Sequence, residues 1–148
     1  MGLSEEDHMA GNIFGNVDHV TIAVRDIDKA RAHFSELLET QFVRLGTLDE
    51  LGLVSWMSPA GLELLGSTRP DGDVAKFLEK KGEGVYALGF TISDIDQARA
   101  KVKKMGIRIA GEIAVDEGPA KGTRELWLHP KDNFGVYLML TQDNPIRS

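Results

Sequence analysis

The sequence contains an internal repeat, and this repeat constrains the fold more than any other feature. The segment DIDKARA at residues 26–32 recurs 68 residues later as DIDQARA at residues 94–100, with one substitution. A duplicated module determines the architecture of a chain, because each copy forms the same supersecondary unit. We therefore interpret the protein as two related halves.

Each copy of the repeat joins a β-rich run to an amphipathic helix. The β-rich runs are residues 17–24 and 85–92. The apolar residues that follow recur at helical spacing: Ile27, Ala30, Phe34 and Leu37 in the first copy, and Ile95, Ala98, Val102 and Met105 in the second. Asp26 and Asp94 precede these helices as capping residues. We expect each helix to pack one apolar stripe against a sheet.

The later part of each half repeats more loosely. WMSP at residues 56–59 is echoed by WLHP at residues 127–130, and each is followed by a glycine and a strand, at residues 61–65 and 135–140. Each half thus reads as a strand, a helix and about three further strands. The pattern predicts an α+β fold of two tandem βαβββ modules.

The predicted domain organisation follows from these halves. We expect one domain over residues 17–142, with module 1 at 17–66, a connector helix within 67–83 and module 2 at 84–142. The connector helix begins after Asp73 and ends near Gly82. Residues 1–16 are predicted to form a loosely held arm, and residues 143–148 a polar tail.

Composition excludes several classes of function. A formal charge of −6 gives no electrostatic basis for binding nucleic acid or an anionic membrane surface. No apolar run is long enough to span a bilayer, and the start of the chain lacks the pattern of a signal peptide, so we expect a cytoplasmic protein. The absence of cysteine excludes disulfides, thiolate nucleophiles and thiolate-bound metals.

Four segments resemble the vicinal oxygen chelate superfamily, which includes glyoxalases, bleomycin resistance proteins and extradiol dioxygenases. Within this superfamily, the segments are most similar to those of the methylmalonyl-CoA epimerases. They are residues 17–24 (VDHVTIAV), 62–65 (LELL), 75–84 (AKFLEKKGEG) and 127–131 (WLHPK). The likeness extends from about Val17 to Gln142. It implies a cupped mixed sheet with a divalent metal at the bottom of the cup, and a homodimer.

The resemblance places four metal ligands on the first and last strands of each half. In this sequence those positions hold His19, Glu63, Ala87 and Met139. Alanine cannot ligate, and a thioether is too soft for the hard ions of this chemistry. Tyr86 does not replace them, since strand alternation turns it away from the cup unless a bulge redirects it. We expect no tightly held metal and no other cofactor; a weak divalent site completed by water or substrate at His19 and Glu63 is an open alternative.

Three residues are candidates for acid–base chemistry. His19 and Glu63 face one cup if the fold is right, and an imidazole beside a carboxylate can transfer a proton near pH 7. The alternative is that both are remnants in a polar cavity. Glu50 resembles a glutamate proposed as a catalytic base in the epimerases, but it also fits a solvated acid in a turn.

Five residues are candidates for binding a substrate. Trp56 and Trp127 occupy equivalent places in the repeat and either line the cup or pack in the core. Ala87 and Met139 widen the cup and make it more apolar. His129 is expected at the mouth of the cup or in a structural hydrogen bond.

Two functions remain open at this point. The first is an epimerase, isomerase or lyase that moves a proton next to a carbonyl of a small substrate, such as an acyl-CoA or another apolar carbonyl compound. The second is a metal-free protein of the bleomycin-resistance type that sequesters a drug or an aromatic ligand. One scaffold can host both.

Overall fold

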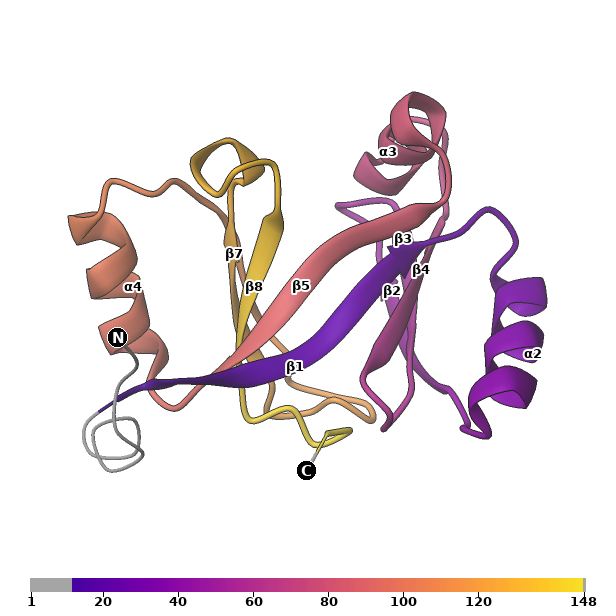
Figure 1. Cartoon of the computed structure of the whole chain (residues 1–148), viewed down its shortest axis with the longest axis horizontal. Helices are drawn as coiled ribbons and strands as arrows, with labels where there is room; N and C mark the ends of the chain where they lie inside the picture. Colours follow the sequence, from indigo (N-terminus) through magenta and orange to yellow (C-terminus); the bar gives the residue numbers. More distant parts are fainter. Residues whose placement is uncertain (1–11, 148) are drawn as a thin grey trace.

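The computed structural model describes residues 12–147 and has the expected α+β architecture. A single eight-stranded mixed sheet has the order β2-β3-β4-β1-β5-β8-β7-β6, and it curls into a cup with helices on its outer side (Figure 1). The strands are β1 (Phe14–Ala23), β2 (Val43–Leu48), β3 (Leu53–Met57), β4 (Leu62–Ser67), β5 (Gly84–Ile92), β6 (Ile109–Ala114), β7 (Arg124–Leu128) and β8 (Tyr137–Gln142). The helices are α2 (Ile27–Leu38), α3 (Asp73–Lys81), α4 (Ile95–Lys104) and the short 3₁₀ turn η1 (Pro130–Asp132).

The two halves meet along β1 and β5. These strands pair antiparallel, while β1 pairs parallel with β4 and β5 pairs parallel with β8. The first and last strands of each half therefore lie side by side, as the duplication requires. The long β1–β5 pair runs between the two half-sheets and forms the bottom of the cup (Figure 1).

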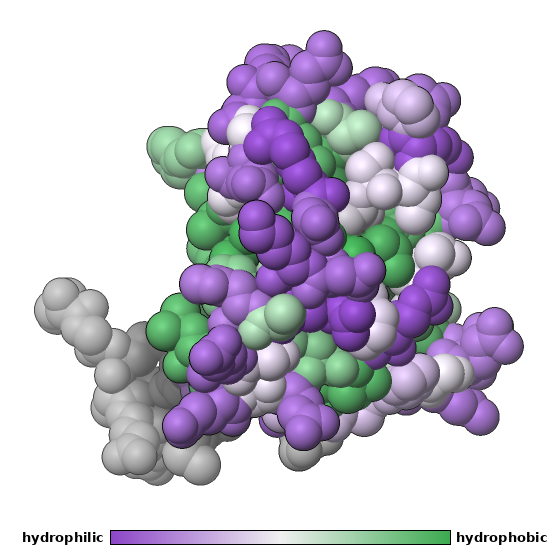
Figure 2. All heavy atoms as spheres, turned by 90° about the vertical axis from the view of Figure 1, so that its right-hand side faces the viewer, coloured by the Kyte–Doolittle hydropathy of each residue, from purple (hydrophilic) through white to green (hydrophobic). Residues whose placement is uncertain are grey.

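The helix caps predicted for the two repeats are present, but the two helices bury their apolar stripes to different extents. Asp26 accepts a hydrogen bond from the Lys29 amide, and Asp94 accepts from the amides of Asp96 and Gln97. Helix α4 buries three of its apolar residues, Ile95, Ala98 and Val102. Helix α2 packs against β4 with a stripe that is only partly buried: Ile27, Ala30 and Phe34 are of intermediate exposure and Leu37 is 63% exposed. Hydrophobic side chains accordingly show between hydrophilic ones on the α2 side of the molecule (Figure 2).

Both ends of the predicted domain differ from the sequence pattern. Strand β1 begins at Phe14, inside the expected arm, and residues 1–11 of that arm lie outside the described residues. The expected tail folds back onto the first half, where Asn144 and Arg147 contact β1. The cup is therefore braced from below by the C-terminal residues.

Candidate active site

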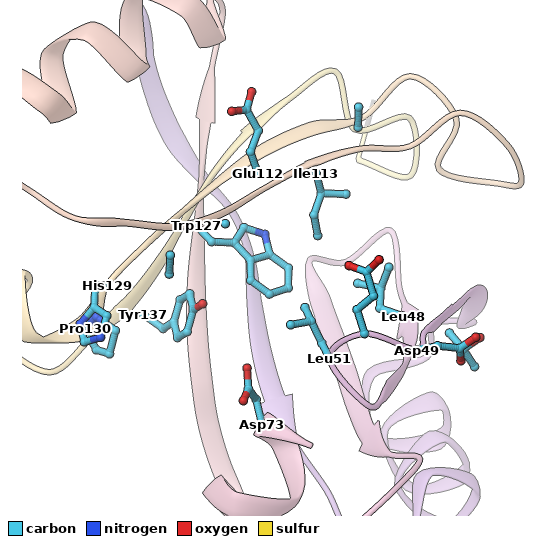
Figure 3. Close-up of a pocket in the computed structure, with 15 residues that line it drawn as sticks. Leu48, Asp49, Leu51, Asp73, Glu112, Ile113, Trp127, His129, Pro130 and Tyr137 are labelled. Carbon is cyan, nitrogen blue, oxygen red and sulfur yellow. The ribbon is translucent and has the colours of Figure 1, made fainter. Parts of the chain in front are cut away.

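The concave side of the sheet holds two adjoining cavities. One has a volume of about 450 Å³ and is lined by Glu63 and Glu125; we call it the carboxylate cavity. The other has a volume of about 850 Å³ and is lined by Tyr137 together with loop residues; we call it the aromatic cavity. Trp127 and Ile113 belong to both walls, and they point with Leu51 into the space between the half-sheets (Figure 3).

Glu63 is held in place on β4 by two hydroxyl groups. Thr21 Oγ1 donates to Glu63 Oε1 at 2.8 Å, and Ser55 Oγ donates to Glu63 Oε2 at 2.6 Å. Both oxygens therefore act as acceptors, which fixes the carboxylate in one orientation. Glu63 is 8% exposed, and that exposure opens into the carboxylate cavity.

His19 lies beneath Glu63 and does not form part of either cavity wall. Its side chain is 1% exposed; Nδ1 is 2.7 Å from Asp18 Oδ2, and Nε2 is 3.5 Å from Glu63 Oε1. Nε2 is a buried nitrogen without a hydrogen-bond partner in the described part of the chain. The structure thus brings the predicted pair together, but only Glu63 reaches the space where a ligand would bind.

The surrounding carboxylates keep His19 protonated. Burial alone would lower its pKa, but the hydrogen bond to Asp18 and the charges of Glu63, Glu125 and Asp18 together raise the pKa of His19 to about 9. At pH 7 the imidazole is therefore a buried cation beneath Glu63. It offsets part of the negative charge in the cup.

The C-terminal residues extend this network. Asn144 Nδ2 donates to Asp18 Oδ2 at 3.0 Å, and Arg147 Nε donates to the Asp18 carbonyl at 2.6 Å. Asp18 and Asn144 are both buried. A chain of contacts consequently leads from Asn144 through Asp18 and His19 to Glu63.

A glycine makes room for the imidazole. Gly89 on β5 pairs with His19, and a Cβ built on Gly89 would lie 2.3 Å from His19 Cε1. Such an approach is far inside van der Waals contact, so any side chain at this position would displace the ring. Gly89 thus contributes to the site because it has no side chain and leaves room for the His19 ring.

Glu125 is a residue that the sequence reasoning missed. It lies on β7 and accepts hydrogen bonds from Thr141 Oγ1 at 2.8 Å and from Trp127 Nε1 at 3.3 Å. Burial, together with the charge of Glu63, raises the pKa of Glu125, against the opposing influence of His19. Since Glu125 stands two residues before Trp127 on one strand, alternation would have placed it on the face assigned to that tryptophan.

The second half contributes an apolar wall where the resemblance implies ligands. Ala87, Met139 and Trp127 form one buried cluster, with Tyr86 and Tyr137 packed against it. The β1–β5 register shifts at Tyr86, whose ring stacks on that of Tyr137 at 5.7 Å. The expectation that Tyr86 turns away from the cup is therefore wrong, because the bulge redirects it.

The side chains present do not fit a divalent metal. His19 Nε2 and a Glu63 oxygen are the two implied donors that remain, and Ala87 and Met139 offer no hard donor. Within residues 12–147, no group of three or more His, Cys, Asp or Glu side chains is placed to hold a metal ion. A catalytic metal site ordinarily has about three protein ligands, so the cup does not match one.

The prediction that Trp56 and Trp127 occupy equivalent places is wrong. The strand register pairs Met57 with Glu63 and Trp127 with Met139, so Met57 is the counterpart of Trp127. Trp56 lies one residue out of phase and faces outward, where the Arg31 guanidinium of α2 covers its ring at 3.6 Å. Trp56 therefore packs under a helix, and Trp127 lines the cup.

Glu50 and His129 both line the aromatic cavity. Glu50 is exposed in the β2–β3 turn, and its carbonyl accepts a hydrogen bond from Arg69 at 2.7 Å. His129 caps η1, where its Nδ1 accepts from the Lys131 amide at 3.1 Å. His129 thus combines the two expected roles, whereas Glu50 lines a different cavity from Glu63.

Comparison with known proteins identifies the class to which this cup belongs. Residues 18–126 match the model of the Glyoxalase/Bleomycin resistance protein/Dioxygenase superfamily, and the chain belongs to that superfamily. Within it, the chain is an epimerase-like enzyme, since several of its similar relatives are methylmalonyl-CoA epimerases. The human mitochondrial enzyme is 32% identical, over 92% of this chain and 80% of the human protein.

Solved structures agree with the sequence comparison. Methylmalonyl-CoA epimerase from Mycobacterium tuberculosis has a TM-score of 0.79 and 28% identity, and 93% of each chain is covered. A Streptomyces coelicolor methylmalonyl-CoA epimerase variant in complex with 2-nitronate-propionyl-CoA has a TM-score of 0.76 and 29% identity, covering 88% of this chain and 98% of that one. Across residues 12–147, no helix has the length and apolar character needed to cross a membrane.

Proposed function

We propose that this protein catalyses epimerisation at the carbon next to the thioester carbonyl of an acyl-CoA. The observation that carries the proposal is a pair of glutamates, Glu63 on β4 and Glu125 on β7, that reach one cavity from opposite half-sheets. Epimerisation needs a base on one side of the reacting carbon and an acid on the other. The similarity to epimerases, one of which is solved with an acyl-CoA analogue, supports the same reaction class.

The two glutamates are suited to opposite tasks. Glu63 accepts hydrogen bonds at both oxygens and faces the His19 cation, so it serves as the base. Glu125 has a raised pKa and serves as the acid. Glu63 takes the α-proton while the C–H electron pair moves into an enolate, and Glu125 then delivers its own proton to the opposite face. The product leaves Glu63 protonated and Glu125 ionised, which is the state required for the reverse reaction.

His19 acts through Glu63 in this scheme. It lies beneath the carboxylate rather than on the cavity wall, and its pKa of about 9 keeps it positively charged at pH 7. Its charge offsets that of Asp18 and Glu63. We therefore assign His19 as a positioning residue. Glu50, which lines the aromatic cavity, stays a predicted catalytic base.

We further propose that the reaction does not use a protein-held metal. The support is the donor set, in which Ala87 and Met139 occupy two of the four implied ligand positions. Elemental analysis of protein purified without chelators is expected to show no stoichiometric divalent metal, and added chelator is expected to leave the rate unchanged. A stoichiometric metal whose removal stops the reaction would contradict this part. Homodimerisation stays an expectation from the resemblance, and light scattering tests it.

Deuterium exchange tests the proposed reaction directly. Branched acyl-CoAs are incubated with the protein in D₂O, and incorporation at the α-carbon is followed by mass spectrometry. The Glu63→Gln and Glu125→Gln variants are each expected to lose at least about 100-fold in exchange rate, the usual contribution of an acid or base. Glu79→Gln, an exposed glutamate of α3, is the matched control and should retain full activity.

Binding measurements separate an enzyme from a sequestering protein. Trp127 lies between the two cavities, so its fluorescence reports occupancy of the cup. Ligands that bind but exchange no deuterium, in wild type and both glutamine variants alike, would contradict the epimerase proposal and favour sequestration.

A further inference from the structure

We infer that the acyl group processed in this cup carries no negative charge: the substrate is an uncharged, branched acyl thioester and not a 2-carboxyacyl one. The inference rests on the proposed function and specifies its substrate class. It is drawn from the charges that line both cavities and from the apolar wall between them.

The carboxylate cavity is strongly acidic. Four carboxyl groups line it; Glu125 is the protonated acid of the proposed reaction, so the repulsion comes from Glu63, Asp116 and Glu117. Arg44 is the cationic residue among the lining residues. It is exposed and pairs across the strands with Trp56, so it is a single cation set against several carboxylates.

The buried cation beneath this cavity is already engaged. His19 Nδ1 is bound to Asp18, and Nε2 faces Glu63. Its side chain is 1% exposed, so a ligand cannot reach it without displacing Glu63. A substrate carboxylate would therefore meet Glu63 first and gain no direct partner in His19.

The aromatic cavity offers no compensating cation either. Asp49, Glu50 and Asp73 line it, and among its lining residues there is no lysine or arginine. Glu112 also lines it but is paired with Arg99 of α4. Nδ1 of His129 is occupied as the cap of η1. A carboxylate on the acyl group would thus be repelled in both cavities.

An alkyl branch finds suitable contacts in the same place. Met139 and Trp127 line the carboxylate cavity and pack together with Ala87. Leu53 and Leu65 complete an apolar wall on the first half. Apolar groups therefore stand where an alkyl substituent can be buried beside the two glutamates.

Two thioesters of nearly the same shape isolate the effect of charge. Isobutyryl-CoA and methylmalonyl-CoA differ by the replacement of one methyl group with a carboxylate. Titration followed by Trp127 fluorescence is expected to show isobutyryl-CoA binding at least about tenfold more tightly at low ionic strength. Deuterium exchange at its α-carbon is expected to be correspondingly faster.

Salt and charge-neutralising variants test the cause. Raising the ionic strength from about 0.02 M to about 0.5 M should narrow the difference in affinity between the two thioesters, because salt screens exposed charges. The Asp116→Asn, Glu117→Gln double variant should also narrow it by weakening the repulsion of methylmalonyl-CoA, whereas Glu79→Gln should leave it unchanged. Both variants change surface positions, and their melting temperatures verify the fold.

The outcomes distinguish this inference from the proposed function. If methylmalonyl-CoA binds more tightly and exchanges faster than isobutyryl-CoA, the inference is overturned while the epimerase function stands. If isobutyryl-CoA binds more tightly but neither thioester exchanges, the charge selectivity stands and the proposed reaction fails. Equal binding that is insensitive to salt also overturns the inference.

Discussion

At the scale of single residues, the unusual feature is a buried imidazolium among carboxylates. His19 gains a hydrogen bond from its contact with Asp18 and lies 3.5 Å from Glu63. These partners outweigh the cost of burying its charge, and the pKa of His19 is raised to about 9. The protonation of this residue is consequently tied to the folded state.

This linkage predicts a loss of stability as pH rises. The folded protein holds the His19 proton up to a pKa of about 9, whereas the unfolded chain releases it near 6.5. The contribution is therefore complete below about pH 6.5 and is lost as the pH rises through 9, by roughly 3 kcal/mol in the free energy of unfolding, since one pKa unit corresponds to about 1.4 kcal/mol.

Urea denaturation across this pH range measures the effect. The difference in unfolding free energy between wild type and His19→Gln should shrink between about pH 6.5 and 9. His33→Gln, an exposed residue of α2, is the control and should run parallel to wild type. NMR titration of the His19 ring gives the pKa directly, and a value at or below that of a free histidine would contradict the prediction.

The close approach of Gly89 to His19 gives a second prediction. Gly89→Ala forces the ring to move, because the new methyl would lie 2.3 Å from Cε1. We expect a loss of about 1–3 kcal/mol in unfolding free energy, typical of overpacking, and a lower pKa for His19 as its contacts with Asp18 and Glu63 lengthen. Gly111→Ala on β6 is the matched control, since nothing lies within 4 Å of its added methyl. Equal stability of the two variants would contradict this account.

The success of the residue-level predictions depended on assigning each residue to the correct face of its strand. His19 and Glu63 lie together as the resemblance implied, because it places them on the first and last strands of the first half. Trp56 was misplaced because the WMSP and WLHP segments match by letter but differ by one residue in register. Glu125 was overlooked because the implied donor position is Met139 on the neighbouring strand, although alternation with Trp127 would have placed Glu125 on the same face.

At the scale of elements, the C-terminal residues are the part of the site that the sequence pattern did not indicate. Their sequence is polar and lacks periodicity, so it reads as a tail, yet Asn144 is buried against Asp18 and Met57. Docking of this kind depends on long-range side-chain contacts, which local patterns do not encode. Helices and strands, by contrast, followed from caps and periodicity.

Loss of the Asn144 contact is expected to weaken both the fold and the site. Asn144→Ala removes the hydrogen bond to Asp18 and leaves a buried acceptor less satisfied, which should cost about 1–2 kcal/mol of unfolding free energy. Deuterium exchange should slow, because Asp18 no longer holds His19 firmly beneath Glu63. Asn16→Ala, an exposed asparagine of β1, is the control. A destabilised variant with an unchanged exchange rate and an unchanged His19 pKa would show that Asn144 serves the fold alone.

At the scale of the whole molecule, the duplication made the architecture predictable. The seven-residue repeat and the echo of residues 56–59 at 127–130 indicated two βαβββ modules, and the resemblance implied a cup. The sheet order and the β1–β5 pairing confirm the cupped mixed sheet. The extent to which each helix covers the sheet was not predictable, because α2 and α4 have similar stripes but unequal burial. Curvature of the sheet and packing between halves decide that difference.

The antiparallel β1–β5 pair relates the two halves by an approximate twofold axis, but the acids do not obey it. In the first half the carboxylate comes from β4, and in the second half from β7. In the proposed reaction, a flat enolate between the two glutamates would present its two prochiral faces to groups with different neighbours. The chamber would then be chiral at the point of reaction, and the enantiomer whose α-hydrogen points toward β4 is expected to react first.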